Sequence, residues 1–237
     1  MSISIFGENE FFVRLPSLVL SLLMAFFISK YIANKKLPFF LPCLILFSLP
    51  EFFLHAGVVS TDISLSFSIM LIMISFWKIS EKRSLIWESL FIVGIATGLL
   101  SKGPISIVLT FPPLFLWGLR FRLPIRTLFR ISWIFGLLLA LPWYFLIEKK
   151  SPGFTNYFIV GEHFLRFIDS SWAGDKYGFP KQQPYGIVWI FLILGTIPWI
   201  FSLLKKLIKN FTSIWDNKWE FFLWSWLLWT PIFFTIS

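Results

Sequence analysis

Long uninterrupted apolar runs constrain this chain more than any other feature of its sequence. A hydrocarbon core about 30 Å thick needs roughly 20 helical residues to cross, and several runs approach that length with few or no charges inside them. Eight runs are predicted to form helices, at residues 12–32, 37–54, 63–77, 85–100, 104–119, 127–147, 185–204 and 219–236. The chain is therefore expected to be embedded in a membrane.

Helices are favoured over barrel strands because the runs are continuously apolar, whereas barrel strands alternate apolar and polar residues. Hydrophobic residues make up 57% of the chain, more than a water-soluble domain can bury. We predict an all-α fold, a multi-pass transmembrane bundle of about eight helices forming a single domain over residues 1–237. The third run is rich in serine, at Ser64, Ser66 and Ser68, so it is expected to face protein rather than lipid.

The formal charge of +9 would suit a nucleic-acid partner, but the positions of the basic residues indicate a membrane orientation instead. Lysines and arginines cluster after alternate runs, and the positive-inside rule assigns such loops to the cytoplasm. These loops lie around residues 30–36, 78–83, 120–126 and 205–218. The other connections and both chain ends are predicted to lie outside the cytoplasm, and no nucleic acid is expected as a partner.

One connection, residues 148–184, is long enough to carry function, since structureless segments of this length are uncommon in compact proteins. Its acidic residues offset its basic ones, so we predict an extracytoplasmic loop. Within it, residues 156–167 can form a helix bearing Tyr157, Phe158, Phe164 and Phe167. Aromatic side chains of this kind suit a helix lying at the membrane interface.

The start of the chain has no basic n-region and carries Glu8 and Glu10, so it is not a signal peptide. The predicted orientation then requires either translocation of a ten-residue tail or a further helix upstream, and we expect the upstream helix. The single cysteine, Cys43, lies within an apolar run. No disulfide and no cysteine-based metal site is expected within one chain.

Two ionisable residues stand at predicted outer boundaries of the membrane, where such groups are costly and are functional candidates by default. Asp62 follows Ser60 and Thr61 directly before a run, so capping of the helix is an equally good interpretation. Lys102 stands in a tight Ser-Lys-Gly-Pro break between two runs. That break can form a compact anion site at the start of the next helix, or the lysine can merely extend to water.

A third group of polar residues lies on the predicted interfacial helix. Glu162 and Arg166 are four residues apart and can form an exposed ion pair worth a few tenths of a kcal/mol. His163 and Arg166 are three apart and share a helix face, and imidazole with guanidinium suits a lipid phosphate. A purely structural role for the three residues is the alternative.

As a set, these segments resemble a known family. The order runs Phe-Gly-Glu-Asn-Glu-Phe-Phe-Val-Arg-Leu-Pro-Ser (6–17), Ser-Thr-Asp (60–62), Ser-Lys-Gly-Pro (101–104), Leu-Pro-Trp-Tyr (141–144), Pro-Gly-Phe-Thr-Asn-Tyr-Phe (152–158), Glu-His-Phe-Leu-Arg-Phe (162–167) and Gln-Pro-Tyr (183–185). This order resembles the bacterial glycosyltransferases related to lipid A aminoarabinose transferase and to protein O-mannosyltransferases. The resemblance spans essentially the whole chain.

The resemblance implies a C-type glycosyltransferase fold. It also implies an enzyme that moves a sugar from a polyprenyl phosphate to lipid A, another glycan or a protein at the outer face of the plasma membrane. A lipid phosphate leaves without protonation, so the enzyme chiefly needs cations that stabilise its charge. Lys102 and Arg166 would bind this phosphate, with His163 assisting and Glu162 supporting. Asp62 would orient or deprotonate the acceptor hydroxyl as the catalytic carboxylate. A divalent metal is the one cofactor left open.

One departure from the family pattern bears on activity. The family usually carries an Asp-Glu motif in a large first outer loop, and that loop is absent here. We therefore expect a fragment of a longer enzyme, a truncated gene product or a degenerate homologue. The alternative class is a non-catalytic lipid-binding protein or a transporter or flippase. Many transporters have an inverted repeat and a row of ionisable residues at bilayer mid-depth. The runs of this chain show neither, which argues against a transporter.

Overall fold

The structure is a computed structural model that describes residues 9–32, 38–165 and 184–236. All the regular elements in these ranges are helices, with η marking π-helical segments. They are α2 (Glu10–Phe27), η1 (Ile28–Ile32), α3 (Leu41–Phe47), α4 (Pro50–Ala56), α5 (Thr61–Glu81), α6 (Leu85–Lys102), α7 (Ile105–Arg120), α8 (Ile125–Leu128), α9 (Ile131–Lys150), η2 (Asn156–Leu165), α11 (Ile187–Gly195), α12 (Ile200–Asp216) and α13 (Lys218–Ile236). The predicted all-α fold is confirmed for this part of the chain.

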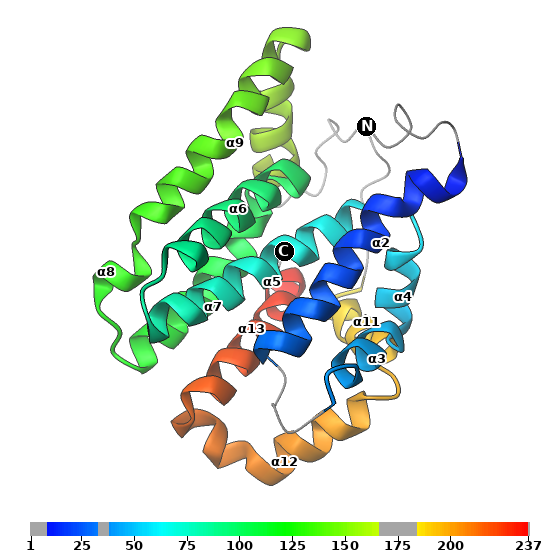
Figure 1. Cartoon of the computed structure of the whole chain (residues 1–237), viewed down its shortest axis with the longest axis vertical. Helices are drawn as coiled ribbons and strands as arrows, with labels where there is room; N and C mark the ends of the chain where they lie inside the picture. Colours follow the sequence, from blue (N-terminus) through cyan, green and yellow to red (C-terminus); the bar gives the residue numbers. More distant parts are fainter. Residues whose placement is uncertain (1–8, 33–37, 166–183, 237) are drawn as a thin grey trace.

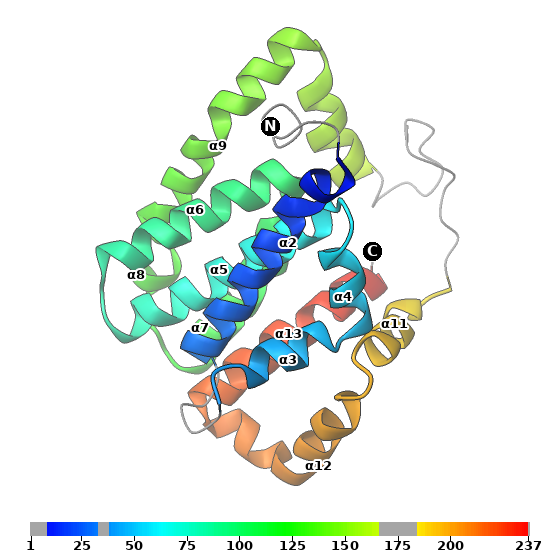
Figure 2. The same ribbon diagram turned by 45° about the vertical axis from the view of Figure 1, so that its right-hand side comes forward.

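The long helices run side by side as an up-and-down bundle (Figure 1). Helix α5 packs most extensively against α6, α6 packs against α9, and α7 packs against α13. Helix α2 lies along the other side of α5, and α12 lies across the lower end of the bundle in both views (Figure 2). From α5 through α6 and α7 to α9 the long helices alternate in direction, so loops far apart in sequence meet at the same end.

Helix α5 is the innermost of the long helices. Of its most apolar stretch 56% is buried, against 22 to 33% for the three other helical segments that are both long and apolar enough to cross a membrane. Every residue from Met70 to Phe76 is buried, and Phe76 packs with Phe91 and Trp117 in the main core. The prediction that the serine-rich run faces protein is confirmed.

The outward surface of the bundle is strongly apolar. On α9, Leu137, Leu138, Leu139, Phe145 and Leu146 are all exposed. Among the described residues four helices are long and apolar enough to cross a membrane, or five if α11 and α12 count as one broken span. Since so large an apolar surface needs lipid around it, the chain is an integral membrane protein.

Two of the eight predicted runs are helical but do not form the single straight span that was expected. Residues 37–54 are divided between α3 and α4, because Pro50 disfavours a helical conformation of Leu49, whose ψ is 120°. Residues 185–204 are divided between α11 and α12, which are bent by 106° at the Gly195 to Trp199 break that contains Pro198. Proline thus converts two candidate spans into broken ones.

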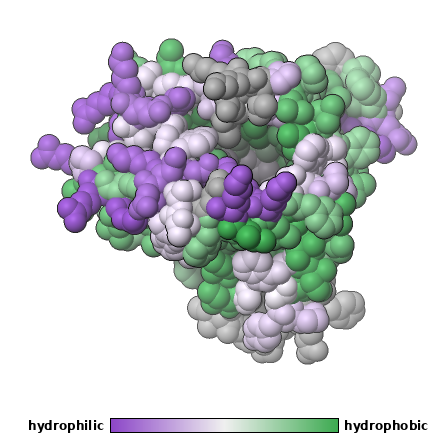
Figure 3. Space-filling view, turned by 90° about the horizontal axis from the view of Figure 1, so that it is seen from below, coloured by the Kyte–Doolittle hydropathy of each residue, from purple (hydrophilic) through white to green (hydrophobic). Residues whose placement is uncertain are grey.

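Ion pairs gather at the lower end of the bundle, which the positive-inside rule assigns to the cytoplasm. Figure 3 looks onto this end, where hydrophilic side chains form patches beside apolar surface. The pairs are Lys78 with Glu81, Arg120 with Asp216, Arg130 with Glu88, and Lys206 with Glu220. Lys78 and Glu81 both lie on α5, whereas each of the other three pairs joins two different helices near this end of the bundle.

The contact between α5, α6 and α7 depends on a glycine. A Cβ placed on Gly98 would meet the Ser68 hydroxyl and would lie 2.6 Å from Ser106 Cβ. Gly98→Ala is therefore expected to lower the free energy of unfolding by about 1 to 3 kcal/mol. Gly57→Ala is the matched control, because its Cβ would meet its nearest atoms at 3.7 Å. Equal unfolding midpoints for the two variants in detergent titrations would contradict the prediction.

Candidate functional site

Asp62 is the second residue of α5, at the upper end of the bundle. Ser60 is the N-cap of this helix, and its hydroxyl accepts a hydrogen bond from the Asp62 backbone N–H at 3.0 Å. The capping role considered for Asp62 therefore belongs to Ser60. The carboxylate of Asp62 is left available for other contacts.

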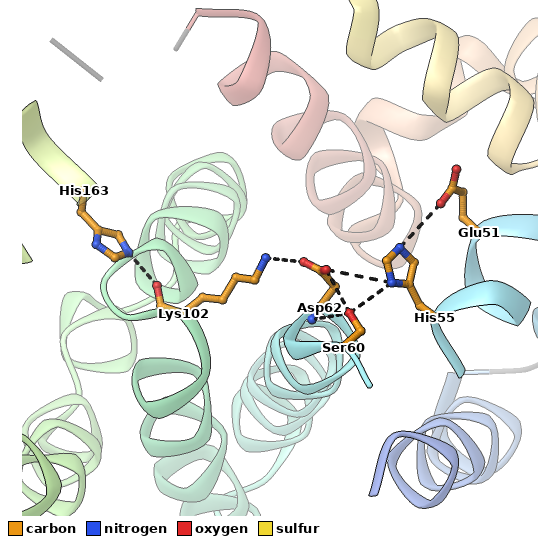
Figure 4. A network of polar contacts seen from close by, with 6 residues as sticks. All are labelled: Glu51, His55, Ser60, Asp62, Lys102 and His163. Atoms are coloured by element: carbon orange, nitrogen blue, oxygen red, sulfur yellow. Dashed lines mark hydrogen bonds and ion pairs between the residues drawn. The ribbon is translucent and has the colours of Figure 1, made fainter. Parts of the chain in front are cut away.

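Lys102 is the last residue of α6 and directs its ammonium group at Asp62 (Figure 4). Lys102 Nζ donates to Asp62 Oδ1 and forms an ion pair with it. The two side chains remain 37% and 48% exposed, so the pair is open to solvent or to a ligand. Lys102 is thus paired across two helices and does not simply extend to water.

The other carboxylate oxygen of Asp62 has its own partners. Ser60 Oγ donates to Asp62 Oδ2 at 3.0 Å, and His55 Nδ1 lies 3.1 Å from Ser60 Oγ and 3.9 Å from Asp62 Oδ2. On the far side of the imidazole, His55 Nε2 lies 3.7 Å from Glu51 Oε2. Helices α4, α5 and α6 therefore contribute one chain of polar contacts, from Glu51 through His55 and Asp62 to Lys102 (Figure 4).

His163 approaches Lys102 from the opposite side and touches its backbone. His163 Nε2 lies 2.6 Å from the Lys102 carbonyl oxygen, and Nδ1 lies 2.6 Å from that of Phe158. Gly103, which follows Lys102, has a φ of 68°, and its lack of a side chain leaves room for the rings of Phe158 and His163. His163 thereby fastens η2 to the turn between α6 and α7.

The segments before η2 support this contact. Tyr144 Oη on α9 donates to the Leu99 carbonyl oxygen in the last turn of α6 at 2.7 Å. Glu148 accepts the backbone N–H groups of Gly153 and Thr155, each at 2.7 Å, and so fixes the turn that leads into η2. The Leu-Pro-Trp-Tyr and Pro-Gly-Phe-Thr-Asn-Tyr-Phe segments thus pack against the end of α6, through Tyr144 on Leu99 and Phe158 on Gly103.

The structure brings some of the predicted site residues together. Asp62 and Lys102 form a pair, and His163 contacts the same lysine through its carbonyl group. Glu162 accepts a hydrogen bond from Tyr157 Oη on η2. Arg166 lies outside the described residues. Residues 156–165 of the predicted interfacial helix are indeed helical, with π-helical winding.

Sequence inspection missed His55 and Glu51. Their spacing of four residues places them on one face of α4, which was a usable signal of a local pair. Their place behind Asp62 depends on the turn between α4 and α5 and had no signal in the sequence.

An apolar groove opens beside this cluster. It has a volume of about 420 Å³ and lies between η2, the start of α7 and the end of α13. Its lining residues are Pro104, Ile105, Val108, His163, Phe164, Trp229, Phe233 and Ile236. Pro104, which lines the groove, follows Lys102 by two residues, so the apolar groove and the Lys102 ammonium lie at the same end of the bundle.

A metal site was left open by the sequence. Across residues 9–32, 38–165 and 184–236, no three His, Cys, Asp or Glu side chains lie close enough to bind one ion together.

Known proteins resemble the chain over nearly its full length. It is 28% identical to an undecaprenyl phosphate-alpha-4-amino-4-deoxy-L-arabinose arabinosyl transferase of Wigglesworthia glossinidia brevipalpis and 25% identical to that of Yersinia pestis (strain Pestoides F). Both matches cover 98% of this chain and 42% of the relative. The chain thus spans about two-fifths of the length of these curated relatives.

The fold also matches solved structures. The crystal structure of ArnT from Cupriavidus metallidurans bound to undecaprenyl phosphate superposes with a TM-score of 0.79 at 18% identity, over 100% of this chain and 43% of that one. The apo form of the same protein gives a TM-score of 0.76 at 19% identity. The chain therefore has the membrane-embedded C-type glycosyltransferase fold that the sequence resemblance implied.

A family description places the chain more firmly than any single relative. The description dolichyl-phosphate-mannose-protein mannosyltransferase matches residues 2–158, which is more than half of the sequence. This range contains α5, α6, the Asp62–Lys102 pair and the turn into η2. The chain belongs to the dolichyl-phosphate-mannose-protein mannosyltransferase family.

Proposed function

We propose that this chain is a membrane glycosyltransferase that uses a polyprenyl-phosphate-linked sugar as donor. The acceptor is a cell-envelope lipid such as lipid A, a glycan or a protein. Transfer takes place at the outer face of the plasma membrane, because the cluster lies at the end opposite the basic loops. The observation that carries this proposal is the pairing of Lys102 with Asp62 beside an apolar groove.

The two charges suit the two halves of the reaction. The acceptor oxygen uses a lone pair to form a bond to the anomeric carbon, while the bond from that carbon to the phosphate oxygen breaks. The bonding electrons stay on the phosphate, where Lys102 stabilises the developing charge. The acceptor hydroxyl loses its proton to the Asp62 carboxylate. No oxidant, reductant or metal is needed to balance this step.

The groove suits the lipid part of such a donor. Its described lining is aromatic and aliphatic, with His163 as the exception, and it lies beside the turn that holds Lys102. A prenyl chain gains free energy by leaving water for such a surface. From the sequence we also propose Arg166 as a phosphate ligand with Lys102 and His163, although Arg166 lies outside the described residues.

Donor binding tests the proposal directly. Lys102→Ala is expected to weaken binding of radiolabelled undecaprenyl phosphate to the chain in nanodiscs by about tenfold or more, since hydrogen bonds to charged groups contribute about 1.5 to 3 kcal/mol. Lys150→Ala is the matched control, because Lys150 is an exposed lysine at the end of α9 that lies at the same end of the bundle as Lys102. Unchanged binding by the Lys102 variant would sink the proposal.

Transfer is then measured with a labelled polyprenyl-phosphate sugar and lipid A, glycan or peptide acceptors. Transfer to one acceptor identifies its class. Tight lipid-phosphate binding without transfer to any acceptor would favour the alternative, a non-catalytic lipid-binding or flippase-like protein.

A further inference from the structure

In the proposed reaction two anions, the Asp62 carboxylate and the donor phosphate, compete for the charge of the Lys102 ammonium. In this structure it is paired with Asp62, yet the proposed function assigns it to the donor phosphate. We infer that Lys102 changes partners when the donor binds, from the Asp62 carboxylate to the lipid phosphate, and that this exchange releases Asp62 as a base. The inference rests on the proposed function and adds an order of events to it.

The carboxylate is held so that Lys102 can leave without displacing it. Lys102 contacts Oδ1, whereas Ser60 donates to Oδ2 at 3.0 Å and the His55 imidazole stands 3.9 Å from that same oxygen. Glu51 supports the other side of the imidazole. Ser60 and His55 are therefore positioning residues that keep Asp62 in place after the ion pair opens.

The backbone at Lys102 also has contacts that do not depend on its ion pair with Asp62. Its carbonyl oxygen faces His163 Nε2, and the next residue, Gly103, donates its N–H to the Leu99 carbonyl oxygen at 2.9 Å. These backbone contacts do not involve the Lys102 side chain, which is 37% exposed. Its four-carbon stem has the rotamer freedom that a change of partner requires.

The exchange has a chemical consequence. A carboxylate paired with an ammonium ion accepts a proton poorly, because protonation would break the ion pair. Asp62 therefore gains basicity at the moment when the donor phosphate takes Lys102. Acceptor activation then follows donor binding, which gives an ordered reaction.

Loss of the Asp62 carboxylate should strengthen donor binding, although Asp62 is the proposed catalytic base. If Asp62 competes with phosphate for Lys102, Asp62→Asn should tighten binding of undecaprenyl phosphate by about two- to fivefold, the range expected from losing a partly exposed ion pair. Glu10→Gln is the matched control, since it removes an exposed carboxylate that pairs only with Arg14 in the described contacts. Its affinity should equal that of the unmodified chain.

A double-mutant cycle separates exchange from simple repulsion between two anions. The Asp62→Asn gain should vanish in a Lys102→Ala background, because no ammonium remains to be released. A gain that persists there, or no gain in the single variant, overturns the exchange while leaving Lys102 as the phosphate ligand. Wild-type affinity of the Lys102→Ala chain overturns both proposals. Asp62→Ala provides a second variant with the same expected direction if the asparagine variant folds poorly.

Discussion

Replacing Glu88 with alanine is expected to lower the free energy of unfolding by about 3 to 5 kcal/mol. Glu88 forms an ion pair with Arg130 and accepts a hydrogen bond from Ser132 Oγ at 2.5 Å. The side chains of Arg130 and Glu88 are only 11% and 21% exposed. Removal of the carboxylate would leave the guanidinium largely buried without its counter-charge, which is the costly way to break such a pair.

Glu81→Ala is the matched control for this effect. Glu81 pairs with Lys78 at 2.9 Å at the end of α5, but the glutamate side chain is 50% exposed. An exposed pair contributes about 0 to 1 kcal/mol, so the midpoint of SDS-induced unfolding should hardly change. Similar midpoints for the Glu88 and Glu81 variants would show that the Arg130 pair contributes no more than a surface contact. Binding of undecaprenyl phosphate should survive both changes, because both residues lie at the end opposite the proposed site.

Gly103→Ala should also lower the free energy of unfolding, by about 2 to 4 kcal/mol. This glycine lies at the proposed site, directly after Lys102. Gly103 has φ 68° and ψ −149°, a backbone region that is essentially restricted to glycine. A Cβ there would lie 2.8 Å from Phe158 Cε1 and 3.0 Å from His163 Cε1. The alanine variant therefore combines backbone strain with displacement of η2 from Lys102.

Gly153→Ala separates these two causes. Gly153 also has a positive φ, of 87°, but a Cβ there would meet nothing within 4 Å. We expect the free energy of unfolding of this control to fall only by the cost of backbone strain at a positive φ, with no added cost from a steric clash. The Gly103 variant should lose more stability and should bind undecaprenyl phosphate more weakly. If both variants lose the same stability and bind the lipid equally, the contact of η2 with the α6–α7 turn has no role in positioning the site.

Much of the architecture could be predicted from the sequence because lipid imposes simple rules on a chain. An apolar run in a bilayer has to satisfy its backbone hydrogen bonds internally, so each of the eight runs contains helix. Its breaks were also within reach of the sequence, since Pro50 and Pro198 stand at them. The serines of the third run indicated the buried position that α5 occupies.

The sequence also placed Asp62 and Lys102 at one end of the bundle. Alternating basic loops fix the direction of each helix, and direction decides which helix ends meet. That reasoning gave proximity but not contact. The ion pair depends on how α5 and α6 are rotated and shifted against each other, and these helices approach closely where Gly98 meets Ser68 and Gly94 meets Ile72.

The sequence by itself therefore determined a helical membrane protein and the end of the bundle at which Asp62 and Lys102 lie. Only the tertiary structure decided that Lys102 pairs with Asp62, that Ser60 and His55 hold the same carboxylate, and that His163 binds backbone carbonyl groups. The reason is physical. Hydropathy acts on each helix separately, whereas a hydrogen bond depends on side-chain packing between helices, which no local pattern in the sequence records.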